Sequence, residues 1–219
     1  MQVKVGRATL LALIASLLIV AIVQPTLAQT GAESVTADQY AKMPSWTAPE
    51  MAPGESYMVD LSEDMPPPGK QGGRMNSCVG FATAYAMKSY MEVQDQGWQA
   101  NHVRRVFSPS FVYNQVNRGQ NRGTSVPAAL NLLRIKGCAT LATMPYKVGD
   151  YRTQPTRSAF TEASRFRISS WFRLQRSSDI RRALQEGHVV VIVVCTDPTF
   201  NSGRYKVYTA AMRAQAIKD

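Results

Sequence analysis

The sequence predicts an α+β protein in which the helices come first and the strands come later. Residues 78–91 are apolar nearly all round, which is typical of a helix buried in the middle of a domain. Residues 189–195 are apolar and mostly β-branched, which indicates a buried strand, and residues 166–174 are a second candidate strand. Because helical and strand patterns do not alternate along the chain, we expect the α+β class rather than an alternating α/β fold.

Three shorter helices are predicted from the residues at their ends. Serine caps a helix start, proline is tolerated in the first turn, and glycine favours the left-handed conformation that ends a helix. These signals place helices from Ser108-Pro109 to about Val116, from Ser125 to Gly137 and from Ser178 to Gly187.

The first 28 residues have the features of a secretory signal peptide. Lys4 and Arg7 precede an apolar stretch over residues 8–23, and small residues lead to a cleavage point after Ala28. The stretch is short for a membrane span, which needs about 20 residues, although an uncleaved anchor is the alternative. We therefore expect a secreted or periplasmic protein with no membrane span once the signal is removed, and with its thiols in an oxidising compartment.

The remainder divides into an arm and one domain. Residues 29–57 are polar and without period, which predicts a linker or a loosely held arm. Residues 58–219 then form the folded domain, which is long enough for a single hydrophobic core, and we expect a monomer.

The charge of the chain is uneven. The 25 Lys and Arg residues exceed the 15 Asp and Glu residues, for a net charge of +10. Residues 29–71 carry seven acids and two bases, whereas residues 72–219 carry 21 bases and eight acids. Such a basic body suits an anionic surface such as a cell envelope. The bases are scattered singly or in pairs with no continuous run, so no nucleic-acid partner is expected.

Cys78 stands where a glycine-rich loop enters the predicted buried helix. The first N–H groups of a helix have no partner within the helix, and its dipole adds a positive potential, so a thiolate there is stabilised and its pKa falls. Gln71 precedes it across a Gly-Gly turn, and its amide is a candidate second donor to an oxyanion, as acyl transfer requires. The alternative is a small apolar cysteine that starts a core helix, with a surface glutamine.

Several stretches of the chain resemble the papain-like cysteine peptidases, above all their bacterial members. Residues 71–82 contain a Gln-Gly turn, then a Ser-Cys pair, then Phe-Ala within the predicted helix, in the order that the family shows. Over about residues 59–208, further stretches agree in order: Phe107-Ser108-Pro109, Gly123-Thr124-Ser125, Gly137-Cys138 with Met144-Pro145-Tyr146, and Gly187-His188-Val189.

The resemblance implies a helical subdomain, whose central helix carries the nucleophile, together with a β-barrel-like subdomain. It implies hydrolysis of peptide bonds through a thioester on Cys78, with the Cys78 backbone N–H and Gln71 holding the oxyanion. Gly123 and Thr124 are similar to the strip that binds substrate backbone along the cleft. The implied partner is a peptide or protein substrate, with no cofactor. Only two histidines are present, so no metal site is expected.

The sequence departs from the family near Cys78 and again toward its end. Met75 and Val79 stand where the family's signature has a cysteine and an aromatic residue, and the interval from Gln71 to Cys78 is one residue longer than usual. The family's general-base His and orienting Asn lie roughly 130–150 residues after the cysteine, and residues 208–219 contain neither.

These departures change the functional expectation. We interpret His188 as a turn residue and His102 as solvated. The sequence therefore predicts a β-subdomain truncated before the His and Asn strands, an unpaired edge beside residues 189–195, and a peptidase that is inactive or weak.

Two other functions stay open. A catalytically inactive, peptidase-like module would bind a peptide or cell-envelope polymer without cutting it, and the missing histidine favours this hypothesis. A different cysteine acyl-transfer enzyme would also carry a cysteine at a helix start, but the turn at Gln71 speaks against it.

The remaining cysteines, Cys138 and Cys195, are expected to be two buried thiols, with a disulfide between them as the alternative.

Overall fold

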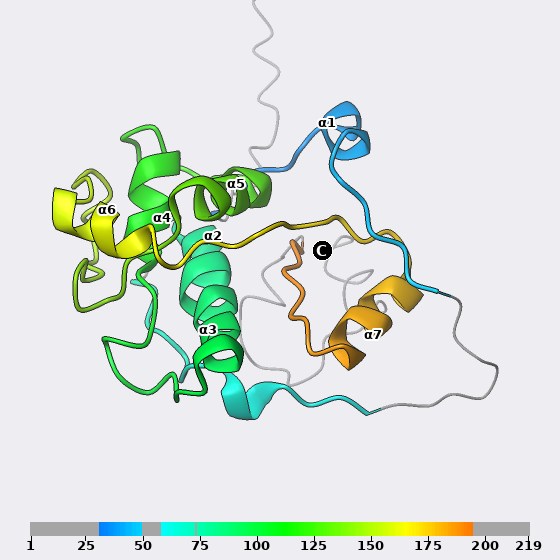
Figure 1. Cartoon of the computed structure of the whole chain (residues 1–219). Coiled ribbons are helices and arrows are strands. Elements are labelled where there is room, and N and C mark those ends of the chain that lie inside the picture. The colour runs from blue at the N-terminus through cyan, green and yellow to red at the C-terminus, as the bar shows by residue number, and fades with distance from the viewer. Residues whose placement is uncertain (1–30, 50–57, 73, 195–219) are drawn as a thin grey trace, which may run out of the picture.

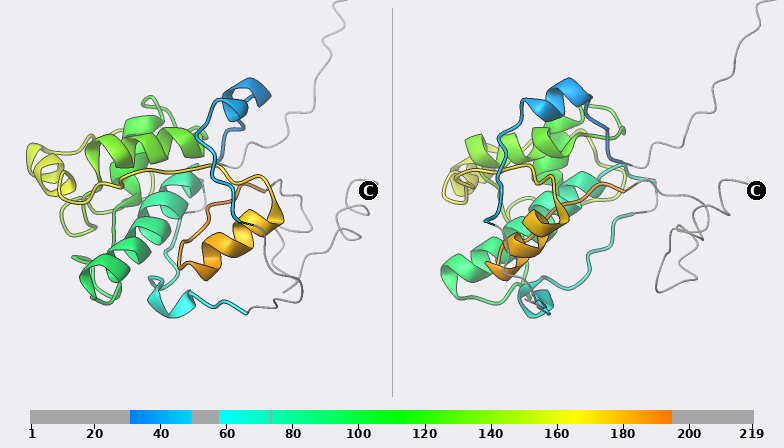
Figure 2. Two further views of the ribbon diagram at one scale, coloured as in Figure 1. Left: turned by 45° about the vertical axis from the view of Figure 1, so that its right-hand side comes forward. Right: turned by 90° about the vertical axis from the view of Figure 1, so that its right-hand side faces the viewer.

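The structure is a computed structural model that describes residues 31–49, 58–72 and 74–194. Helices α2 to α6 lie together on one side, and α1 and α7 lie on the other (Figures 1 and 2). The helices of the described residues are α1 (Ala37–Ala41), η1 (Ser62–Asp64), α2 (Cys78–Gly80), η2 (Phe81–Lys88), α3 (Ser89–Gln96), α4 (Pro109–Val116), α5 (Val126–Lys136), α6 (Arg157–Ala163) and α7 (Ser177–Gln185).

The central helix is one continuous rod made of α2, η2 and α3 (Figure 1). It begins at Cys78, as predicted, and ends at Gly97, whose φ of 66° is the left-handed conformation that stops a helix. The middle section, η2, is a π-helix, a rare form that often marks functional sites. The rod is buried or half-buried from Cys78 to Val93, which agrees with the apolar pattern of residues 78–91, and its last three residues are exposed.

Helices α4 and α5 pack against the rod and enclose the core. Ser108 and Ser125 cap them by accepting hydrogen bonds from the third helical N–H, and each has a proline in its first turn, as the sequence predicts. The fully buried core side chains include Phe107, Phe111, Val112, Tyr113 and Leu133.

Helices α1 and α6 were not predicted from the sequence, although both have local cap signals. Thr36 and Gln39 form a capping box at α1, and Thr156 caps α6. Both helices are short and lack a long apolar period, so the hydrophobic pattern of the sequence does not predict them.

No β-ladder forms among the described residues. Their strand-type pairings are three isolated bridges, Ala32–Thr124, Ser45–Arg173 and Phe107–Thr140. Residues 189–194 form no strand, and Val193 is 54 % exposed, so the prediction of a buried strand over residues 189–195 is wrong for the six residues described. A strand is stable only beside another strand, and none of the described residues provides one. The β-barrel-like subdomain is therefore not confirmed.

The predicted second strand, residues 166–174, is also not a strand. Within it the chain makes one bridge, at Arg173, and otherwise runs as an irregular connection from α6 to α7 (Figure 1). The signal peptide over residues 1–28 and the thiol of Cys195 lie outside the described residues. No helix in the described part of the chain is long and apolar enough to span a bilayer.

Candidate active site

Cys78 is the first residue of α2 and is half-buried. The preceding Ser77 is fully buried, and its hydroxyl lies 3.0 Å from the Tyr146 hydroxyl. Asn76 is fixed to Asn121 by two hydrogen bonds: its backbone N–H donates to the Asn121 Oδ1 atom and its side-chain amide to the Asn121 carbonyl, both at 3.0 Å. These contacts hold the loop before the thiol against the chain that leads to residues 123 and 124.

Gln71 is exposed and lies close to the loop before Cys78. Its amide donates a hydrogen bond of 2.7 Å to the carbonyl of Met75, three residues before the thiol. An amide nitrogen carries two hydrogens, so this bond leaves one of them for another acceptor. The role of Gln71 as an oxyanion donor stays a prediction.

Gly123 and Thr124 are buried and stand directly before the cap of α5. Their partner is the chain's own segment around Ala32, which pairs with Thr124 in a parallel bridge. The Thr124 N–H donates to the Gly31 carbonyl at 3.1 Å, and the Glu33 N–H donates to the Thr124 carbonyl at 2.9 Å. Thr124 is thus paired with backbone of its own chain, and the binding of a substrate peptide by Gly123 and Thr124 stays a prediction.

The same segment covers the thiol. Gly31 is buried with a φ of 61°, and a Cβ atom added to it would collide with the Cys78 Sγ atom. Arg122 and Glu33, the sequence neighbours of Gly123 and Ala32, form an ion pair, with the Arg122 Nε atom 2.8 Å from the carboxylate. Sequence reasoning missed this arrangement, because the pairing joins residues about ninety positions apart and has no local signal.

Burial raises the pKa of the Cys78 thiol above its ordinary value, and the backbone N–H groups of Val79 and Cys78 act in the opposite direction. The sequence predicts a lowered pKa at this helix end, and the structure differs. A helix end stabilises an anion by about 0.3–1 kcal/mol, which is less than one pKa unit, about 1.4 kcal/mol. Partial burial beneath the segment around Gly31 is therefore enough to reverse the effect.

The sequence predicts that His188 is a turn residue and that His102 is solvated, and the structure agrees with both. The His188 backbone N–H donates to the Ala183 carbonyl at 2.8 Å, which closes the turn after α7. The His102 imidazole accepts a hydrogen bond from the Arg104 N–H at 3.3 Å, and both residues are exposed. Residues 208–219, whose sequence contains neither His nor Asn, lie outside the described residues.

Cys138 is a fully buried thiol whose sulfur lies 3.7 Å from the Ser108 carbonyl. Burial raises its pKa far above its ordinary value, so it is a neutral core residue at any physiological pH. The contrast with half-buried Cys78 makes Cys78 the reactive candidate of the two.

A groove of about 950 Å³ adjoins the strip. Its walls come from the start of α5, including Val126 and Leu130, from Trp171 in the connection to α7, and from Ser34 and Val35 next to the covering segment. Its lining also includes Glu33, whose backbone N–H bonds to the Thr124 carbonyl.

Comparison with solved structures connects this geometry to known proteins. The chain is similar to xylellain, a cysteine protease from Xylella fastidiosa, with a TM-score of 0.52 and 18% identity over 69% of this chain and 61% of that one. It is also similar to a chain from a study of the mite allergens Blo t 1 and Der p 1, with a TM-score of 0.51 and 16% identity over 72% of this chain and 52% of that one.

The fold is papain-like. The chain spans about three fifths and one half of the lengths of the two solved chains. No model of a known protein family matches the chain. No curated protein matches it either.

Proposed function

We propose that the chain is a papain-like cysteine peptidase in which Cys78 is the nucleophile and Gly123 and Thr124 hold the peptide backbone. The observation that carries this proposal is the extended segment around Ala32, which hydrogen-bonds to both backbone polar groups of Thr124 while its main chain passes over the Cys78 sulfur. A peptide substrate in the same place would bring a carbonyl carbon to the thiol.

The reaction follows from these positions. The Cys78 thiolate attacks the carbonyl carbon of the peptide bond, and the oxygen takes the negative charge beside the backbone N–H at the start of α2. The C–N bond breaks, the amine leaves with a proton taken from solvent water, and a thioester remains on Cys78. Water then hydrolyses the thioester, which releases the peptide's carboxylic acid and returns the thiol. Gln71 is the proposed second donor to the oxyanion, since its amide stands beside the loop that carries Cys78.

A trapping experiment tests the proposal. The full chain is incubated with an activated ester of a blocked dipeptide, and acyl-enzyme is sought by intact mass, with the modified residue located by peptide mapping. We expect an adduct on Cys78 that decays in water. Cys78→Ala should give none, whereas Cys138→Ala should behave like the wild type because Cys138 is buried.

Two results would count against the proposal. If the dipeptide binds but Cys78 is never acylated, the chain is a peptide-binding module with a papain-like fold. If the peptide neither binds nor reacts even when the covering segment is displaced, the strip at Thr124 is not a substrate site.

A further inference from the structure

The segment that covers Cys78 continues across the molecule to α7. We call residues 31–49 the strap. It leaves the cleft beside α5, turns through α1 and descends to the start of α7 (Figures 1 and 2). The sequence predicts a loosely held arm here, yet the strap is attached at three places along its length.

The middle attachment is at Arg173. Its N–H donates to the Pro44 carbonyl at 2.8 Å and its carbonyl accepts from the Trp46 N–H at 3.2 Å, which forms the parallel bridge at Ser45. Its guanidinium also lies 4.9 Å from the centre of the Tyr40 ring. These contacts align the strap with the connection that leads into α7.

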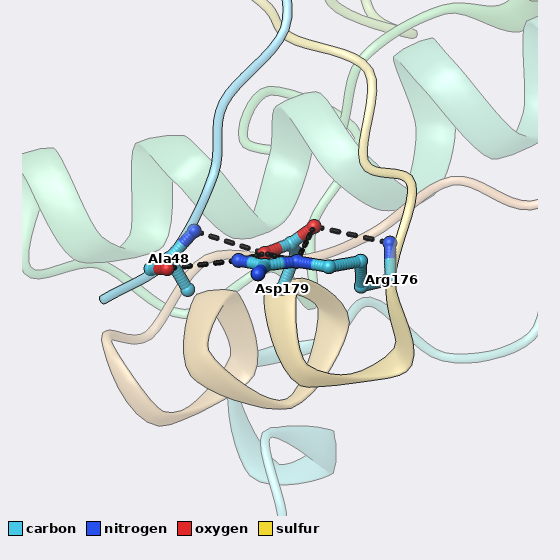
Figure 3. A network of polar contacts seen from close by, with 3 residues as sticks. All are labelled: Ala48, Arg176 and Asp179. Atoms are coloured by element: carbon cyan, nitrogen blue, oxygen red, sulfur yellow. Dashed lines mark hydrogen bonds and ion pairs between the residues drawn. The ribbon is translucent and has the colours of Figure 1, made fainter. Parts of the chain in front are cut away.

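The last attachment is at Ala48 and involves a buried charge (Figure 3). The Ala48 N–H donates to the Asp179 Oδ1 atom at 2.9 Å, and the Ala48 carbonyl accepts from the Arg176 guanidinium at 2.9 Å. Arg176 and Asp179 are themselves paired at 2.7 Å. Asp179 is 1 % exposed and Ala48 is 4 % exposed, whereas the Arg176 side chain is 46 % exposed. Both backbone groups of Ala48 are therefore bonded to one ion pair, of which the carboxylate is buried and the guanidinium is at the surface.

The two ends of the strap differ in kind. The cleft end is held by two backbone hydrogen bonds and by an Arg122–Glu33 ion pair whose side chains are 40 % and 27 % exposed, and such exposed pairs contribute little. At the α7 end the Ala48 N–H donates to the buried Asp179 carboxylate, and a hydrogen bond to a charged group is stronger than one between two neutral backbone groups. The distal end is therefore the firmer anchor.

We propose that Arg176 and Asp179 form a latch on α7 that controls access to Cys78 by holding the strap at Ala48. The physical basis is effective concentration: while Ala48 is fixed, the segment at Gly31 is confined near the cleft and rebinds quickly whenever it lifts. Releasing Ala48 leaves the bridge at Arg173 as the remaining attachment of the strap to the connection before α7. When that bridge also opens, the tether lengthens, the effective concentration falls and the thiol is uncovered more often. That this control serves to admit a substrate rests on the proposed function. The control of access to Cys78 does not.

The rate at which iodoacetamide alkylates Cys78 in the full chain tests the latch, with each modified cysteine assigned by peptide mapping. Asp179→Asn keeps the shape of the side chain but turns an acceptor of the Ala48 N–H into a weaker, uncharged one. Ala48→Pro removes the N–H donor and leaves α7 unchanged. Each doubling of the tether length corresponds to about a threefold change in effective concentration, so we expect both variants to be alkylated at Cys78 about three times faster than the wild type.

Two controls accompany these variants. Glu186→Gln breaks an exposed ion pair with Arg182 on the same helix, and we expect it to leave the Cys78 rate unchanged. Cys138 is fully buried and reports unfolding, because it reacts only when the core opens.

An unchanged Cys78 rate in both latch variants, with Cys138 protected, would overturn the proposal. So would simultaneous alkylation of Cys78 and Cys138 in both variants, since the pair would then stabilise the whole fold instead of the strap. Faster alkylation of Cys78 without formation of an acyl-enzyme would support the latch. It would count only against the proposed peptidase function.

Discussion

Gly31 and Cys78 are in contact across the cleft, with the backbone of the glycine lying on the sulfur of the cysteine. The left-handed φ of 61° turns the chain at this point, and the missing Cβ provides the space that the sulfur occupies. The nucleophile candidate and its cover are thus fitted to each other at a position where only glycine is compatible with both the backbone and the sulfur.

The first prediction concerns Gly31→Ala. The new methyl group collides with the Cys78 sulfur, so the strap should lift and Cys78 should be alkylated several times faster, as measured by the same mapped iodoacetamide assay. Gly119→Ala is the matched control, because Gly119 also has a positive φ, 71°, but has open space around its Cβ position. Both variants pay roughly 1–2 kcal/mol for the left-handed backbone. Equal Cys78 rates in the two variants would contradict the prediction.

The second prediction concerns the pH dependence of that alkylation. The thiolate is the reacting species, and burial raises the Cys78 pKa in the covered state. Lifting the strap removes part of this burial while the N–H groups at the helix start remain. The rise of the alkylation rate with pH should therefore occur at lower pH in Gly31→Ala than in the wild type. Superimposable profiles would show that the strap does not set the pKa.

The third prediction concerns acid stability at the latch. Hydrogen bonds from Arg176, together with the Ala48 N–H, hold the Asp179 pKa well below its usual range. A lowered folded-state pKa adds stability above the unfolded pKa of about 3.9, and this stability is lost as the pH falls below that value. The wild type should exceed Asp179→Asn in free energy of unfolding by a constant amount between about pH 8 and pH 5, and the difference should shrink below about pH 4. Urea titrations at several pH values measure it, and a difference that already shrinks between pH 7 and pH 5 would disprove the assignment.

The fourth prediction concerns the core. Leu133 in α5 is fully buried, so Leu133→Ala should lower the free energy of unfolding by about 2–5 kcal/mol through lost burial and the cavity that remains. Ile135, two residues later, is 59 % exposed, and Ile135→Ala should change it by less than about 0.5 kcal/mol. Comparable losses in a denaturant titration would mean that α5 faces the core differently.

Much of the helical half was predictable from local signals. The start of the central helix at Cys78, the caps at Ser108 and Ser125, and the stop at Gly137 are where the sequence places them. Each is set by side-chain and backbone chemistry within a few residues. The π-helical section, η2, was not predictable, because packing around the rod selects it and no single residue specifies it.

The candidate site divides in the same way. A thiol at the start of a buried helix and a Gly-Thr strip before α5 are readable in the sequence, and both are present in the structure. The raised pKa of Cys78 was not readable in the sequence, because it depends on burial, and Gly31, which is distant in the sequence, is one of the residues against the sulfur. The strand predicted over residues 189–195 failed for a related reason, since its pattern describes a residue's preference and not the presence of a neighbouring strand.

By itself, the sequence determined the start of the central rod with its thiol, and the helices α4 and α5 with their caps, because these depend on neighbours within one or two turns. Only the tertiary structure decided that Gly31 lies on Cys78 and that Ala48 is bound by Arg176 and Asp179. Backbone hydrogen bonds between remote segments carry no sequence signature, since every residue except proline offers the same donor and acceptor.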